Sequence, residues 1–147
     1  MTFHFCAVSF DYAFGCSPQL HRSAVGGYPV TSHEVVLFLE LVRQAARHGR
    51  LKPRERQKNQ RTLALLGLSY QDMIGCILGL RPEHALSPPW DNRNPGHPGE
   101  RVCDFGTYIG EHQLYVKIAV VGLEDGAAGA IVSFHLAERP FDYCFEA

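Results

Sequence analysis

The chain has 147 residues, which is enough for one domain with a substantial buried core. Its 46% hydrophobic and 20% charged residues exclude an intrinsically disordered chain. Its net charge of −1 excludes a molecule that binds polyanions over its whole surface.

The five cysteines are widely spaced and form no Cys-x-x-Cys pair, which argues against a zinc ribbon and a thioredoxin-type site. The His, Cys and Asp residues show no spacing typical of metal ligands, so we predict neither a metal nor a cofactor. The N-terminus lacks the cationic and apolar regions of a signal peptide, and no run of about twenty apolar residues is long enough for a membrane span. We therefore expect a cytoplasmic protein with reduced thiols and no membrane contact.

Residues 1–30 are predicted to be an N-terminal extension. Thr2 to Phe10 alternates loosely and is rich in aromatic residues, which favours an extra edge strand, whereas Gly and Pro residues break the chain repeatedly after it. The extension is either an added strand with a loop or a segment that docks weakly on the main domain. We expect that domain to span residues 31–138.

The first clear element is a helix from Ser32 to Arg47. Thr31 and Ser32 are candidate N-caps, and Glu34 follows Thr31 at the spacing of a capping box. Gly49 provides the stop. The apolar residues recur at helical spacing and predict one buried stripe, made of Val35, Val36, Phe38, Leu39, Val42 and Ala46.

A basic stretch runs from Arg43 to Arg61 and holds eight of the fourteen Lys and Arg residues, against only Glu55. Such a stretch in an otherwise acidic chain is consistent with nucleic-acid binding on one face, and equally with a solvated helix and loop. Leu51 to Arg61 reads as polar chain broken by Pro53. The candidate phosphate-binding cations in it are Lys52, Arg54, Arg56, Lys58 and Arg61.

Short helices are predicted after the basic stretch. Thr62 to Gly67 indicates a helical turn or a small helix, and Ser69 is the expected N-cap of a helix from Tyr70 to Leu78. Its predicted buried stripe is Met73, Ile74, Ile77 and Leu78.

A further short helix is expected from Arg81 to Ser87, because Pro82 suits a first turn. Pro88 to Gly99 holds four prolines and predicts a long loop that carries Trp90. This tryptophan either stacks on a base of RNA or covers the core from the loop.

Three strands follow, Arg101 to Ile109, His112 to Val121 and Ala130 to Leu136. A Gly110-Glu111 turn joins the first two, and a Gly-rich segment with an Asp125-Gly126 step joins the last two, so antiparallel pairs are expected. The alternating aromatics of residues 139–147 predict one more edge strand in a C-terminal tail.

Period-two alternation divides these strands into two faces. One face is predicted to pack on the helices and carries Leu114, Val116, Ile118, Val120, Val132, Phe134 and Leu136. The other places Tyr115, Lys117, Ser133 and His135 in one neighbourhood, together with Ile131. On the first strand, Val102, Asp104 and Gly106 alternate with Cys103, Phe105 and Thr107.

The order of these motifs resembles the MqsR toxins, the ribonuclease partners of bacterial toxin–antitoxin pairs. The resemblance covers roughly residues 32–136. It rests on the succession Gly67-Leu-Ser-Tyr-Gln-Asp-Met-Ile-Gly-Cys-Ile-Leu-Gly-Leu80, then Gln113-Leu-Tyr-Val-Lys-Ile-Ala-Val120, then Ile131-Val-Ser-Phe134.

The resemblance implies a small RelE-like α+β domain, with two or three helices packed on a twisted antiparallel sheet of three to five strands. It also implies metal-independent cleavage of mRNA and neutralisation by a cognate antitoxin. Tyr115 stands at the family's functional tyrosine, whereas the family's lysine after the last Ser-Phe is here His135. The family's Lys-Ser segment is here Leu86-Ser87, and the glutamine before Asp104 is absent.

Metal-free RNA cleavage requires a base for the 2′-hydroxyl, an acid for the leaving 5′-oxygen and cations for the developing charge. Histidine suits proton transfer because its side chain titrates near neutrality. We therefore select His135 as acid or base, Tyr115 as a phosphate-orienting or proton-donating group, and Lys117 and Arg101 as cations. Each of these residues is alternatively an ordinary strand or loop side chain.

Two functions follow from these features. The first is an endoribonuclease toxin that holds the RNA backbone on the basic stretch. The second is a non-catalytic binding or inhibitor protein on the same scaffold, which uses its sheet edge and its loop.

Overall fold

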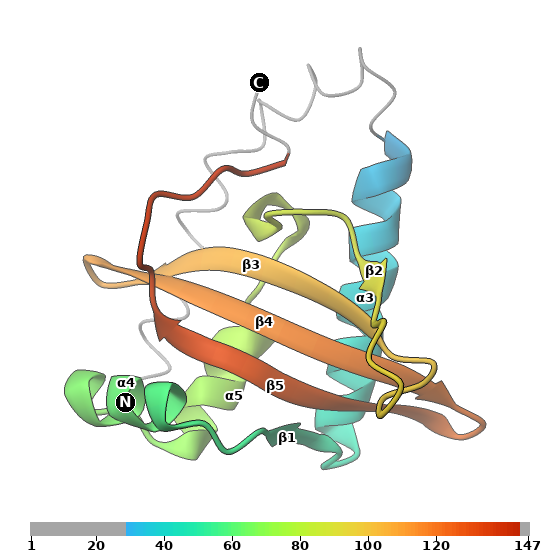
Figure 1. The fold of residues 1–147 in the computed structure, drawn as a ribbon, viewed down its shortest axis with the longest axis horizontal. Helices are drawn as coiled ribbons and strands as arrows, with labels where there is room; N and C mark the ends of the chain where they lie inside the picture. The colour runs from blue at the N-terminus through green and yellow to red at the C-terminus, as the bar shows by residue number, and fades with distance from the viewer. Residues whose placement is uncertain (1–28, 145–147) are drawn as a thin grey trace.

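The computed structural model describes residues 29–144. Five strands form one sheet in the order β1-β5-β4-β3-β2, and helices α3 and α5 lie on one side of it (Figure 1). The expected α+β fold is confirmed. In chain order the elements are α3 (Pro29–Arg47), β1 (Leu51–Pro53), α4 (Gln57–Leu66), α5 (Tyr70–Leu78), the 3₁₀ helix η3 (Pro82–His84), β2 (Trp90–Asp91), β3 (Arg101–Ile109), β4 (His112–Leu123) and β5 (Gly126–Leu136).

Helix α3 begins at Pro29 instead of Ser32, so the predicted caps Thr31 and Ser32 lie inside the helix. A proline suits this position because its missing N–H has no partner in a first turn. Most of the predicted stripe is buried against the sheet, including Val35 and Leu39. Val36 is 44% exposed, which corrects its place in the stripe, because each residue turns the helix by about 100°.

The structure adds a strand to the basic stretch and extends the helix predicted from Thr62 back into it. Leu51–Pro53 forms β1, which pairs in parallel with β5, so the sheet is mixed instead of purely antiparallel. The burial of Leu51 in the core anchors this short strand. Helix α4 then begins already at Gln57 and ends before Gly67, whose φ of 68° closes the helix in the left-handed conformation.

Helix α5 has the predicted bounds. Ser69 accepts a hydrogen bond from the backbone N–H of Asp72, and the Asp72 carboxylate accepts one from the N–H of Ser69, which completes a capping box. Of the predicted stripe, Met73 and Ile77 are buried, whereas Leu78 is 40% exposed and so is no core residue.

The expected helix from Arg81 to Ser87 is reduced to η3. It ends early because Ala85 bridges to Phe105 and Leu86 donates its N–H to the Asp104 carbonyl on β3. The following loop contains the short strand β2, which pairs Trp90 with Val102.

Strand β3 has the predicted bounds, and two-residue turns connect β3 to β4 and β4 to β5. Strand β5 begins at Gly126 instead of Ala130, and Gly126 adopts a φ of 137° directly after the second turn. This conformation favours glycine and accounts for the Asp-Gly step.

A bulge interrupts the pairing of β4 with β5. Ile118 pairs with Ile131, but Lys117 pairs with Ser133, so Val132 is an extra residue. Ile131 is therefore fully buried in the core, and Val132 is not a core residue. This reverses the predicted faces of these two residues, because alternation across a bulge shifts by one.

The tail does not form the predicted edge strand over residues 139–144. Instead, the Tyr143 hydroxyl donates to the Gly106 carbonyl, and the Phe141 ring lies so close to Gly106 that a Cβ there would be 2.5 Å from a ring carbon. The strand expected at residues 2–10 and the end of the tail, residues 145–147, lie outside the described residues. Within 29–144, no helix has the length and apolar character that a membrane crossing requires.

Candidate functional site

Helices α3 and α5 lie on one side of the sheet, and the opposite face is called here the open face (Figure 1). The polar site lies on the open face, because Tyr115 and His135 alternate with the core residues Val116 and Phe134 along their strands. Two rows of paired residues cross β3, β4 and β5 on this face. One row is Asp104, Lys117 and Ser133, and the next is Gly106, Tyr115 and His135. The structure thus brings together the four residues that the alternation predicted, and adds Asp104.

Tyr115 and His135 face each other across β4 and β5. Their ring centroids are 5.3 Å apart with the planes tilted by 33°. The Tyr115 hydroxyl donates to the Asp104 Oδ2 (3.1 Å), and the Ser87 hydroxyl donates to the Asp104 Oδ1 (2.9 Å). Burial, together with the Asp104 carboxylate, raises the pKa of Tyr115, so its phenol stays protonated at neutral pH.

The hydrogen bonding of His135 determines its neutral tautomer. Its Nδ1 lies 2.9 Å from the Leu136 carbonyl oxygen, which can only accept a hydrogen bond. The hydrogen of the neutral imidazole is therefore on Nδ1, and Nε2 carries the free lone pair. Nε2 is therefore the ring nitrogen that is available to accept a proton.

Two more predicted residues meet on the open face. The Lys117 ammonium lies 5.8 Å from the centre of the Trp90 ring, within the range of a cation–π contact. Trp90 is 38% exposed, so it combines a contact to the sheet with a solvent-facing part.

Arg101 does not join the site. Arg101 lies three positions before Asp104 on β3, and an odd separation along a strand places two side chains on opposite faces of the sheet. Its Nε pairs with Asp91 Oδ1 (3.2 Å), and its Nη2 donates to the Pro89 carbonyl (3.0 Å), so it secures β2 and the loop before it.

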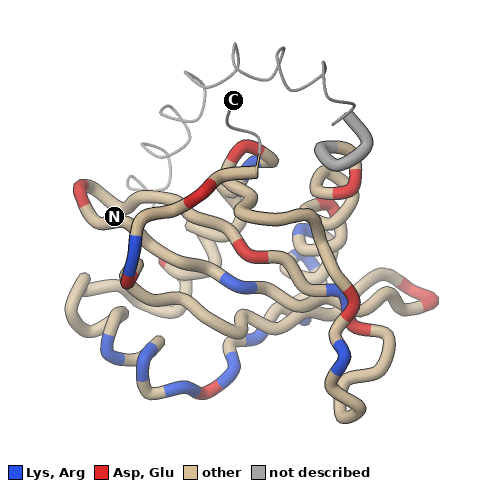
Figure 2. Tube along the Cα trace, turned by 45° about the horizontal axis from the view of Figure 1, so that its top comes forward, with Lys and Arg blue, Asp and Glu red and all other residues tan. Residues whose placement is uncertain are grey.

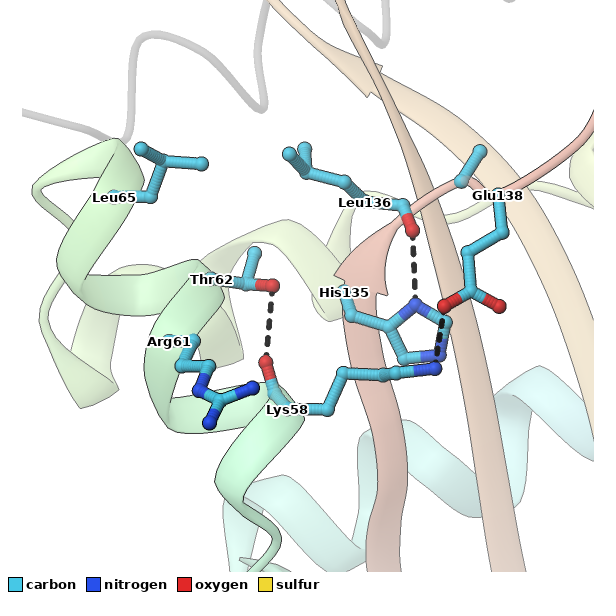
Figure 3. Close-up of a pocket in the computed structure, with 8 residues that line it drawn as sticks. Lys58, Arg61, Thr62, Leu65, His135, Leu136 and Glu138 are labelled. Carbon is cyan, nitrogen blue, oxygen red and sulfur yellow. Dashed lines mark hydrogen bonds and ion pairs between the residues drawn. The ribbon is translucent and has the colours of Figure 1, made fainter.

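A pocket of about 230 Å³ lies between α4 and the end of β5, next to His135. It is lined by Lys58, Arg61, Thr62, Leu65, His135, Leu136, Ala137 and Glu138. Figure 3 shows the His135 imidazole between the Leu136 carbonyl and the ion pair of Lys58 with Glu138. The pocket thus places two cations of the basic stretch beside the predicted base.

The remaining cations of the basic stretch differ in their partners. Lys and Arg residues follow one another along β1 and α4 (Figure 2). Arg54 pairs with Glu100 (2.8 Å), and Arg56 donates to the Val132 carbonyl and the Ser133 hydroxyl. Lys52 is exposed on β1, and within residues 29–144 neither it nor Arg61 pairs with a carboxylate.

Sequence reasoning missed Asn59, which connects α4 to β5. This side chain is 3% exposed, donates from Nδ2 to the Val132 carbonyl (3.2 Å) and accepts the Phe134 N–H at Oδ1 (2.9 Å). It therefore holds the bulge from both sides. No local signal marks it, because an asparagine in a helix is ordinarily solvent-exposed.

Asp104 was missed as a member of the site, although a signal for it existed. A two-residue turn at Gly110-Glu111 pairs Ile109 with His112, and counting back along both strands pairs Asp104 with Lys117. Turn length and alternation together place this carboxylate beside the tyrosine.

Metal-ion chemistry and thiol chemistry have less support in the described part of the chain. No three His, Cys, Asp or Glu residues between 29 and 144 come together in a way that could hold a metal ion. Burial raises the pKa of the Cys103 thiol, which disfavours the nucleophilic thiolate.

The site is thus a cross-strand tyrosine–histidine pair with a carboxylate, a lysine–tryptophan contact and a cationic pocket around it.

In comparisons with known proteins, no family model matches the chain, and no curated protein or solved structure shows significant similarity to it.

Proposed function

We propose that this protein is a metal-independent endoribonuclease that cleaves mRNA in the cytoplasm, as the toxin of a pair with a cognate antitoxin protein. The observation that carries the proposal is the pairing of His135 with Tyr115 on the open face, beside cations from α4. The order of motifs that resembles the MqsR toxins supports the same function.

The proposed reaction begins at the Nε2 of His135, which removes the proton of a ribose 2′-hydroxyl. The 2′-oxygen attacks the adjacent phosphorus, and the bond from phosphorus to the 5′-oxygen breaks. The histidinium or water protonates the leaving oxygen, so the products are a 2′,3′-cyclic phosphate and a 5′-hydroxyl. Lys117 and the α4 cations stabilise the negative charge of the transition state.

Tyr115 has a positioning role in this scheme. Because its phenol stays protonated and donates to Asp104, it supports the His135 ring and does not act as a base. Trp90 offers a partly exposed indole on which a base of single-stranded RNA can stack.

A second candidate is a non-catalytic binding or inhibitor protein. The observation that favours it is the number of basic residues that already pair with carboxylates, such as Arg50 with Asp125 and Arg54 with Glu100. Such pairs reduce the positive charge available to RNA.

Cleavage of a transcript by the purified protein tests the proposal. His135→Ala should lower the cleavage rate by about 10²–10⁴-fold, the usual contribution of general acid–base catalysis, with RNA affinity little changed. His112→Ala is the matched control, because His112 is an exposed histidine at the start of β4. The products should carry 2′,3′-cyclic phosphates, and EDTA should have no effect. Full activity in both His135→Ala and Tyr115→Phe would exclude this site and favour the binding protein.

A further inference from the structure

The pocket between α4 and β5 has a charged side and an apolar side. Lys58, Arg61 and Glu138 provide the charges, and Leu65 and Leu136 provide the apolar contacts. Leu65 is 68% exposed, and Figure 3 shows it reaching toward Leu136 across the pocket. A nucleotide has the same division, because an anionic phosphate is joined to a base with apolar faces.

The two cations of the pocket are not equivalent. Arg61 has no carboxylate partner within residues 29–144, whereas Lys58 is held by the Glu138 carboxylate. The side chains of Lys58 and Glu138 are 54% and 65% exposed. Solvent-exposed ion pairs of this kind contribute little to stability, so a competing anion can displace the carboxylate at small cost.

We propose that the α4–β5 pocket binds one phosphate group of single-stranded RNA between Lys58 and Arg61, and that Glu138 occupies this place until the RNA displaces it. This inference rests on the proposed function, because it concerns how RNA reaches His135. A phosphodiester carries one negative charge on two free oxygens, as a carboxylate does, but in this pocket it can contact both cations, whereas the Glu138 carboxylate pairs with Lys58 alone.

Glu138 remains a carboxylate throughout the neutral range. The hydrogen bond from Lys58 lowers the pKa of Glu138, and the nearby charges of Lys58, His135 and Arg139 act in the same direction. Glu138 therefore keeps the negative charge with which it competes for the Lys58 ammonium.

Binding of a short fluorescein-labelled 2′-O-methyl RNA, measured by fluorescence anisotropy at low salt, tests this inference. The methyl groups remove the attacking hydroxyl, so the readout does not depend on cleavage. Glu138→Gln should tighten binding by about threefold or more, because the RNA phosphate no longer has to displace a carboxylate from the Lys58 ammonium. Glu124→Gln is the matched control, because it removes the same charge from the exposed turn between β4 and β5 and should change binding less than twofold.

The Lys58→Ala background completes the design. There, Glu138→Gln should change affinity less than twofold, because the cation for which Glu138 competes is gone. No gain in Glu138→Gln, equal gains in both glutamine variants, or a full gain without Lys58 would each overturn the proposal. Cleavage of unmodified RNA, assayed separately on the same preparations, distinguishes a failure of the nuclease function from a failure of this competition.

Discussion

Replacement of Asn59 by alanine should destabilise the protein far more than its place on a short helix indicates. The Phe134 N–H that donates to Asn59 Oδ1 belongs to a fully buried residue, so alanine leaves that donor unsatisfied at a cost of about 1–3 kcal/mol. The bond to the Val132 carbonyl adds about 1 kcal/mol, partly retained because Arg56 also donates to that oxygen. The better helix propensity of alanine returns about 0.5 kcal/mol. We expect a net loss of about 1–3 kcal/mol.

Chemical denaturation of the purified protein measures this loss. Gln60→Ala is the matched control, because Gln60 is exposed on the same helix and its replacement should stay within about 0.5 kcal/mol of wild type. Asn59→Asp adds a second comparison, because an aspartate accepts from Phe134 but cannot donate to Val132, and it buries a charge. It should therefore be at least as destabilising as alanine at neutral pH.

Asn59→Ala should also affect the candidate site. Since Asn59 holds the bulge that turns His135 toward Tyr115, its loss should move the His135 ring resonances away from the shifts that stacking on Tyr115 causes. Equal stabilities of Asn59→Ala and Gln60→Ala, with unchanged His135 resonances, would refute the proposed role of Asn59.

Two further predictions concern buried positions. Burial lowers the pKa of His84 to about 4, below the value near 6.5 of the unfolded chain, so the unfolded state binds more protons. The free energy of unfolding should therefore fall by about 3 kcal/mol as the pH decreases from 6.5 to 4. His84→Gln should flatten this part of the curve of stability against pH. An unchanged curve would contradict the lowered pKa of His84. Gly106→Ala should cost about 1–3 kcal/mol, because the new Cβ meets the Phe141 ring. The cost should fall by more than half in a Phe141→Ala background, and an equal cost in both backgrounds would show that the contact with Phe141 is not its cause.

Local signals in the sequence determined several elements fully. Helix α5 has its predicted bounds because the capping box of Ser69 and Asp72 acts within one helical turn. Strand β3 and its faces follow from alternation, which depends only on neighbouring residues. The shared face of Tyr115 and Lys117 follows for the same reason.

The tertiary structure alone decided that β1 forms, that α4 begins already at Gln57 and that β5 contains a bulge. Leu51 joins the core and starts a parallel strand only because β5, far along the chain, offers it an edge. The shared face of His135 and Tyr115 was predicted from continuous alternation, but the same alternation also placed Ile131 there, and Ile131 is in the core. Only the bulge at Val132 allows Ile131 to lie in the core while His135 lies on the open face. Hydrogen bonds from Asn59 on α4 hold this bulge. Because α4 and β5 are far apart in the sequence, no local pattern records this contact.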